Sequence, residues 1–102
     1  MSRTYYEVTA TMSDPSATDA WLAWMLGEHI ADVVRAGAES GRVIRRDEPP
    51  HTFIAQYEFA SRAALDAYLA HHAPRLRAEG VRRFGDRVSY RRRVGQTVNR
   101  VT

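Results

Sequence analysis

Histidine supplies the best candidates for chemistry in this chain of 102 residues, which has four His. Imidazole titrates near neutral pH, so it can accept, donate or relay a proton. At about 100° per residue, helical spacing from Trp21 places His29 near the middle of an otherwise apolar helix face. A polar ring there needs a hydrogen-bond partner or a cavity. His29 is therefore either a hydrogen-bonding or proton-transfer group in a pocket between helix and sheet, or a structural side chain bonded to Tyr57 or a backbone carbonyl.

His72 is a second candidate, near the end of another predicted helix. It extends the face that carries Leu65 and Leu69, so it could turn toward the same space as the first candidate. The alternative is a helix C-terminal His that hydrogen-bonds free carbonyl groups ahead of Pro74 and complements the helix dipole. Adjacent helical residues point apart, so His71 does not pair with it around a metal. We therefore expect no metal site.

Large apolar side chains occur on the same predicted helix as the first candidate. Trp21 points toward the core and Trp24 more toward the flank of that helix. Such rings either line a pocket for a flat apolar molecule or fill a core and an interface. The residues predicted to bind a ligand are His29, Tyr57, Trp21, Met25 and His72.

Several classes of function are excluded by composition and motifs. The chain has no Cys, which rules out disulfides, cysteine-zinc sites, iron–sulfur clusters and thiol catalysis. It has no P-loop, Gly-rich dinucleotide turn, nucleophile elbow or HExxH motif, and we predict no cofactor. No segment approaches the roughly 18 apolar residues of a membrane span, and Met1 to Thr4 show no apolar leader region. We therefore expect a cytoplasmic protein that does not span a membrane.

The basic residues are all Arg and are unevenly distributed. The first 61 residues hold five Arg and nine acids, whereas the last 41 hold ten Arg and three acids. The basic part could attract an anionic partner or be a solvated surface. RNA recognition on a sheet of this kind needs aromatic stacking groups on the third strand. Here the outward residues are Ile54, Gln56 and Glu58, so we expect no specific nucleic-acid binding.

Alternation and spacing of apolar residues predict the secondary structure. Strands are predicted over residues 5–12, 39–46, 51–59 and 84–94. A first helix is predicted over residues 17–36, ending at Gly37. A second begins after the capping residue Ser61. Pro74 fits best as the first residue of a short turn that Gly80 closes.

This order, β-α-β-β-α-β, limits the topology to an α+β domain. Two right-handed β-α-β units joined by the Pro49-Pro50 turn give a four-stranded antiparallel sheet with two helices on one face. Residues 1–94 are predicted to form a single domain, and residues 95–102 a C-terminal tail.

The sheet face opposite the helices is predicted to be polar. It carries Tyr5, Glu7, Thr9, Ile54, Gln56, Glu58, Arg87, Ser89 and Arg91. Such a face is either exposed to water or paired with a second subunit, where opposed Glu and Arg groups could form ion pairs across a twofold axis.

Several segments together resemble one family. They are Trp21-Leu22-Ala23-Trp24-Met25, Glu28-His29-Ile30, Gln56-Tyr57, His72 to Gly80 and Phe84-Gly85-Asp86-Arg87. Over residues 4–94 this pattern is similar to a small bacterial family, domain of unknown function 4286. The resemblance implies a ferredoxin-like fold of the dimeric α+β barrel type, without an assigned activity. The wider superfamily includes haem-degrading enzymes, which suggests His72 as a haem ligand by analogy of fold alone. We expect no stable haem binding.

The leading hypothesis is a homodimeric ferredoxin-like domain that binds a small, partly aromatic ligand between its helices and sheet. Catalysis, if present, would run through His29 with Tyr57. Two alternatives stay open: a non-catalytic dimerisation module whose polar pocket is structural, and a cofactor-free monooxygenase-like enzyme. A cavity of roughly a few hundred Å³ beside His29 would favour ligand binding, and a filled core would favour the module.

Overall fold

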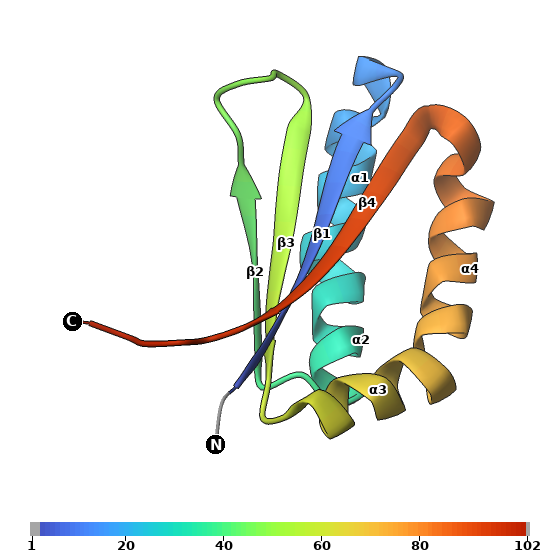
Figure 1. The fold of residues 1–102 in the computed structure, drawn as a ribbon. Helices are drawn as coiled ribbons and strands as arrows, with labels where there is room; N and C mark the ends of the chain where they lie inside the picture. Colours follow the sequence, from blue (N-terminus) through green and yellow to red (C-terminus); the bar gives the residue numbers. More distant parts are fainter. Residues whose placement is uncertain (1–2, 102) are drawn as a thin grey trace.

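The computed structural model describes residues 3–101 and contains one four-stranded sheet (Figure 1). The strands are β1 (Thr4–Met12), β2 (Ser40–Arg45), β3 (Thr52–Phe59) and β4 (Val88–Gln96). Their order across the sheet is β2-β3-β1-β4, and each neighbouring pair is antiparallel. The predicted four-stranded antiparallel sheet and its ferredoxin-like element order are confirmed.

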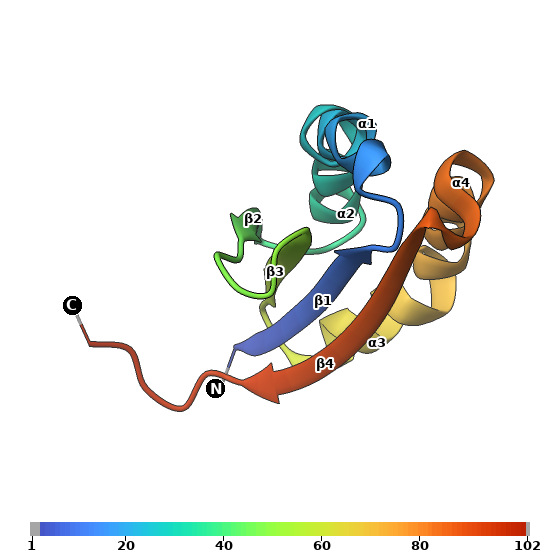
Figure 2. The ribbon, with the colours of Figure 1, turned by 90° about the horizontal axis from the view of Figure 1, so that it is seen from above.

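The helices all cover one face of the sheet (Figure 2). The connection from β1 to β2 consists of η1 (Pro15–Ala17), α1 (Thr18–Trp24), η2 (Met25–His29) and α2 (Ile30–Arg35). The connection from β3 to β4 consists of α3 (Arg62–His71), α4 (Ala73–Phe84) and η3 (Gly85–Arg87). Because β3 lies between β1 and β2, and β1 between β3 and β4, each β-α-β unit is split by a strand of the other.

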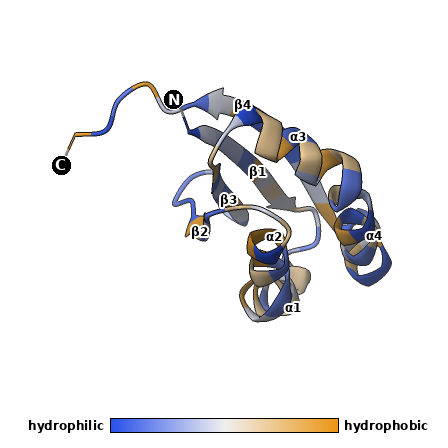
Figure 3. Cartoon of the chain, turned by 90° about the horizontal axis from the view of Figure 1, so that it is seen from below, coloured by the Kyte–Doolittle hydropathy of each residue, from blue (hydrophilic) through white to orange (hydrophobic). Residues whose placement is uncertain are grey.

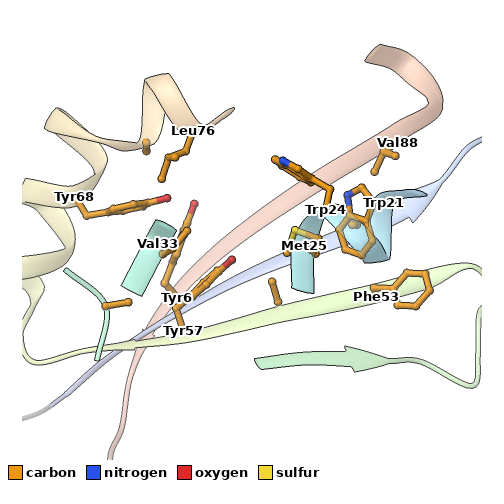
Figure 4. Packing of buried hydrophobic residues seen from close by; sticks show 14 of the residues in the cluster. Tyr6, Trp21, Trp24, Met25, Val33, Phe53, Tyr57, Tyr68, Leu76 and Val88 are labelled. Carbon is orange, nitrogen blue, oxygen red and sulfur yellow. The ribbon is translucent and has the colours of Figure 1, made fainter. Parts of the chain in front are cut away.

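The core forms between the inward strand faces and the helices. Residues of β1 and β3 alternate as predicted, so that Tyr6, Ala10, Phe53, Tyr57 and Phe59 are buried. Figure 4 shows three tyrosines, from β1, β3 and α3, grouped at one end of this core and two tryptophans at the other. Burial of each large apolar side chain contributes about 1.5–3 kcal/mol, which fixes the helices on the sheet.

The first helical connection is not a regular α-helix. Residues Met25–His29 form a π-helical turn between α1 and α2. A π turn holds more residues than an α turn and shifts the face that follows it. The buried face therefore continues from Trp21 and Met25 to Val33, while Leu26, which a regular helix would place on the apolar face, is 67% exposed.

The second connection differs from the prediction in its length. Pro74 stands in the first turn of α4, where a missing N–H breaks no helical hydrogen bond. The helix then continues past Gly80 to Phe84, so the predicted short turn is wrong. A Cβ at Gly80 would lie 3.1 Å from Trp24 Cη2. This glycine lets α4 approach Trp24 and does not end the helix. Hydrophilic and hydrophobic residues intermix along α3 and α4, as expected for helices with one buried face (Figure 3).

The last strand is consequently displaced along the chain. It begins at Val88 and not at residue 84. Arg87, predicted on the open sheet face, lies in η3, where its guanidinium donates to the carbonyls of Arg83 and Phe84. The strand ends at Gln96, beyond the predicted end at residue 94, and the Thr97 N–H donates to the Arg3 carbonyl at 3.0 Å. The outer ends of the predicted domain and tail, Met1, Ser2 and Thr102, lie outside the described residues.

Capping at the start of α3 is as predicted. The Ser61 side-chain oxygen accepts a hydrogen bond from the Ala64 N–H at 3.1 Å, which satisfies one of the free donors of the first turn. Within residues 3–101, no helix combines the length and the hydropathy that crossing a membrane requires.

Candidate functional site

A groove of about 240 Å³ lies between the first helical connection, α4 and β4. Its lining residues are Trp24, His29, Leu76, Arg77, Gly80, Val81, Tyr90 and Arg92. The wall is mainly apolar and aromatic, with guanidinium groups contributed by α4 and β4. Pockets that recognise small molecules combine such walls with a few polar groups, so this groove is the candidate site.

His29 reaches the groove because it ends the π-helical turn. Its ring lies against the Trp24 ring, with centroids 4.4 Å apart and planes inclined by 31°. Burial lowers the pKa of His29, and the carboxylates of Asp32 and Glu79 oppose this effect only in part. The imidazole is therefore neutral at neutral pH, so it can accept a hydrogen bond or a proton. Helical spacing predicts that the His29 ring points toward the sheet. In the structure the ring instead faces α4, at the flank of its own helix.

Two polar atoms at the groove are buried without a hydrogen-bond partner: His29 Nδ1 and Trp24 Nε1. A buried unpaired donor or acceptor costs about 1–3 kcal/mol, and native proteins contain few of them. Nδ1 forms neither the predicted bond to Tyr57 nor one to a backbone carbonyl. Two such atoms on neighbouring rings indicate a place where a bound polar group could supply the missing hydrogen bonds.

Tyr90 connects the groove with the core behind it. Its hydroxyl accepts a hydrogen bond from Trp21 Nε1 at 3.1 Å, and burial raises its pKa. Trp21 itself is 1% exposed and packs against Phe53, with ring centroids 5.3 Å apart and planes inclined by 37°. Trp21 therefore contacts a residue of the groove wall and is not part of the wall itself.

Two arginines line the groove from different elements. Arg77 of α4 donates from Nη2 to the Tyr6 hydroxyl at 3.1 Å. Arg92 of β4 pairs with Val8 of β1 in register, on the strand face that turns toward the helices, and its guanidinium lies 5.4 Å from the Tyr90 ring centroid. Among residues 3–101, neither guanidinium is within ion-pair distance of a carboxylate.

The other predicted site residues are not brought to this groove. Tyr57 is buried and packs on Tyr6 with ring centroids 5.9 Å apart, and burial raises its pKa well above the usual value. Met25 is buried in the core. His72 stands at the junction of α3 and α4, where its N–H donates to the Tyr68 carbonyl at 2.9 Å. Of the five predicted residues, His29 alone lines the groove.

Sequence reasoning missed most of the groove wall. The sequence predicts Trp24 on the helix flank and Gly80 at the end of a turn, not in a groove wall. The signal for Gly80 was present in the sequence, because Leu76, Gly80 and Phe84 are four residues apart and continue one helical face. Arg92 also carried a signal, since strand alternation places it on the same side as Tyr90.

A second hollow, of about 380 Å³, lies on the open face of the sheet. It is lined by Glu7, Thr9, Thr11, Arg46, Pro49, Thr52, Ser89, Tyr90, Arg91 and Arg93. The face is polar, as predicted: the Tyr5 hydroxyl donates to Glu7 at 2.9 Å and Arg42 Nε to Gln56 at 2.7 Å. Within the part of the chain that the structure describes, no three His, Asp or Glu side chains gather as metal ligands would.

Solved structures share this fold over nearly the whole chain. A dimeric ferredoxin-like protein from an uncultured marine organism is similar with a TM-score of 0.68 at 12% identity, over 99% of this chain and 100% of that one. HapK from Hahella chejuensis is similar with a TM-score of 0.72 at 17% identity, over 97% and 96% of the two chains. A protein from Deinococcus radiodurans, named as a candidate antibiotic biosynthesis monooxygenase, has a TM-score of 0.70 at 17% identity and the same coverage.

These likenesses confirm the ferredoxin-like α+β fold. No curated protein sequence matches the chain significantly. The family resemblance predicted from the tryptophan, histidine and C-terminal segments is confirmed by a match over residues 3–98. The chain belongs to the family described as Domain of unknown function (DUF4286).

Proposed function

We propose that this protein is a homodimeric ferredoxin-like domain that binds a small, partly aromatic ligand in the groove beside His29. One observation carries the proposal: His29 Nδ1 and Trp24 Nε1 are buried without partners beside an unfilled groove. A purely structural pair of rings would gain stability by pairing these atoms within the protein. A ligand with a polar group on a flat ring would pair them if its binding turns the two rings toward the groove, because neither atom is accessible in the free protein.

The size and walls of the groove limit the ligand. About 240 Å³ is below the roughly 300–1,000 Å³ typical of pockets for drug-sized molecules. The ligand is therefore small, with one or two rings. Trp24 and Leu76 offer apolar contact, and neutral His29 offers a hydrogen-bond acceptor or donor. Tyr57 has no place in this version of the site.

The homodimer is proposed from the neighbours and from the open sheet face. Two of the similar solved proteins are described as dimeric and ferredoxin-like. The exposed face of the sheet in this chain carries both Glu7 and Arg93, which are register partners on adjacent strands. A second copy can match such a face across a twofold axis. Light scattering at high micromolar concentration should give the mass of a dimer, and a monomer mass would overturn this part of the proposal.

Ligand binding is best tested on the two indole N–H groups. Screening small aromatic compounds by NMR should identify binders that move the Trp24 Nε1–H signal strongly, because that group is unpaired. The Trp21 signal should move less, because its N–H already donates to Tyr90. His29→Leu should abolish binding, whereas the matched control His71→Leu, on the exposed end of α3, should retain it. Failure of every aromatic compound to bind would favour the non-catalytic dimerisation module.

A second candidate function is oxidation of the bound ligand. Its support is the Deinococcus radiodurans protein, whose name refers to a monooxygenase, and a neutral His29 that could accept a proton from a ligand hydroxyl. An aromatic hydroquinone offered with dioxygen should then be consumed by the wild-type protein, and the rate should fall to background in His29→Leu. Tight binding without oxygen uptake would leave ligand binding as the function.

A further inference from the structure

Arg92 occupies an unusual position for a charged residue. On β4 the side chains alternate between the two sheet faces, and Val88, Tyr90 and Arg92 share the face turned toward the helices. Val88 is buried and Tyr90 half-buried, whereas Arg92 opens into the groove. Arg92 is exposed, so its guanidinium is in water in the free protein and is accessible to an anion that enters the groove.

A second guanidinium lines the same groove. Arg77 of α4 is held toward Tyr6 by its hydrogen bond to the hydroxyl, which uses one of five N–H donors. Glu79 and Asp32 lie close enough to affect His29, but neither lines the groove. The groove is thus apolar along Trp24, Leu76 and Val81, and cationic at two points.

We propose that the ligand of this groove is a small aromatic carboxylic acid, with its ring along Trp24 and its carboxylate between Arg77 and Arg92. The proposal rests on the ligand-binding function above and names the ligand class. Guanidinium groups bind carboxylates through charge-assisted hydrogen bonds that are frequently bidentate. The ring supplies the apolar contact that a free inorganic anion lacks.

Three probes separate the parts of this proposal: 2-naphthoate, its neutral isostere 2-naphthamide, and inorganic phosphate. Calorimetry on the full chain should show 2-naphthoate binding at least roughly tenfold more tightly than 2-naphthamide, with phosphate weaker than both. In Arg92→Gln the preference of acid over amide should fall below about twofold. The matched control Arg82→Gln removes the same charge from an exposed position of α4 outside the groove and should keep the full preference.

The outcomes distinguish this inference from the proposed function. Equal affinity for the acid and the amide, with both moving the Trp24 indole signal, would overturn the carboxylate assignment and leave ligand binding standing. Phosphate binding as tight as naphthoate would also overturn it, because the ring would then contribute nothing. Binding of neither aromatic probe, together with failure of the wider aromatic screen, would reject the proposed function itself. Circular dichroism of Arg92→Gln should match the wild type. If the spectra differ, Arg77→Gln is used instead of Arg92→Gln. A preference for 2-naphthoate over 2-naphthamide that stays above about fivefold in Arg77→Gln would overturn the assignment.

Discussion

Replacing His29 by Leu separates a binding role from a structural one most directly. The change removes the orphan Nδ1 atom, which returns about 1–3 kcal/mol to the folded state. It also removes ring contact with Trp24, 4.4 Å away, and aromatic pairs of this kind contribute about 0.5–1.5 kcal/mol. The expected change in unfolding free energy therefore lies between a loss of about 0.5 kcal/mol and a gain of about 2.5 kcal/mol.

The same variant has a pH signature. Because burial lowers the pKa of His29 in the folded state, the unfolded chain binds a proton more readily than the folded one. The free energy of unfolding should therefore fall as the pH drops below about 6.5, the pKa of His in an unfolded chain, and should keep falling until the pH passes the pKa of His29 in the folded state. His29→Leu lacks this component. Urea denaturation at about pH 8 and about pH 5 should show a smaller loss in the variant than in the wild type.

His29→Phe is the companion variant. It keeps an aromatic ring beside Trp24, but its larger volume can cost about 1–3 kcal/mol by overpacking. A loss above about 1 kcal/mol in both variants, with unchanged pH dependence, would refute the reasoning. It would mean that the imidazole makes a stabilising hydrogen bond, and the site hypothesis for His29 would fall with it.

The remaining predictions concern packing, capping and assembly. Gly80→Ala should change the free energy of unfolding by less than about 1 kcal/mol, because alanine favours the helix by about that amount while Trp24 must move to relieve a 3.1 Å contact with the new Cβ. Trp24 would move into the groove, so ligand affinity measured by calorimetry should fall several-fold. Ser61→Ala should lower the free energy of unfolding by about 1 kcal/mol in urea titrations. Ser61→Thr should retain most of the wild-type stability, because its hydroxyl can still accept the hydrogen bond from the Ala64 N–H. Titration with haemin should give no Soret shift characteristic of ligation by His72, and a shift lost in His72→Ala would contradict this.

Most of the fold could be predicted from the sequence because its elements carry strong local signals. Alternation of Phe53, Ala55, Tyr57 and Phe59 identified both the strand and its buried face. Ser61 marked the start of a helix by chemistry that needs no tertiary context. At Gly80 two features compete: glycine predicts a stop, whereas helical spacing continues through it to Phe84, and the structure follows the spacing.

The candidate site could be predicted only in part, because its geometry depends on an irregular turn. A regular helix from Trp21 places Leu26 and His29 on one apolar face. The π-helical turn at Met25–His29 ends that register, so that Leu26 is exposed and His29 moves to the flank that meets α4. Nothing in the local sequence distinguishes a π turn from an α turn, since tertiary packing selects it. Strand alternation and the spacing of a second helix also predict Tyr57 and His72 at the site, and both lie outside the groove.

The π-helical turn at Met25–His29 and Arg92 on β4 both contribute to the same groove. A π turn costs helical hydrogen-bond geometry, and such turns occur frequently at functional positions. Here it places His29 on Trp24 and leaves one nitrogen of each ring unpaired. Across the groove, Arg92 occupies a core-facing position of β4 without a carboxylate partner among the described residues. The π turn and the two unpaired nitrogens lower stability, whereas Arg92 is exposed to water. The unpaired nitrogens and the guanidinium groups all lie at one small groove. This arrangement favours a binding site, because one ligand with a flat ring and an anionic group would interact with all of these groups.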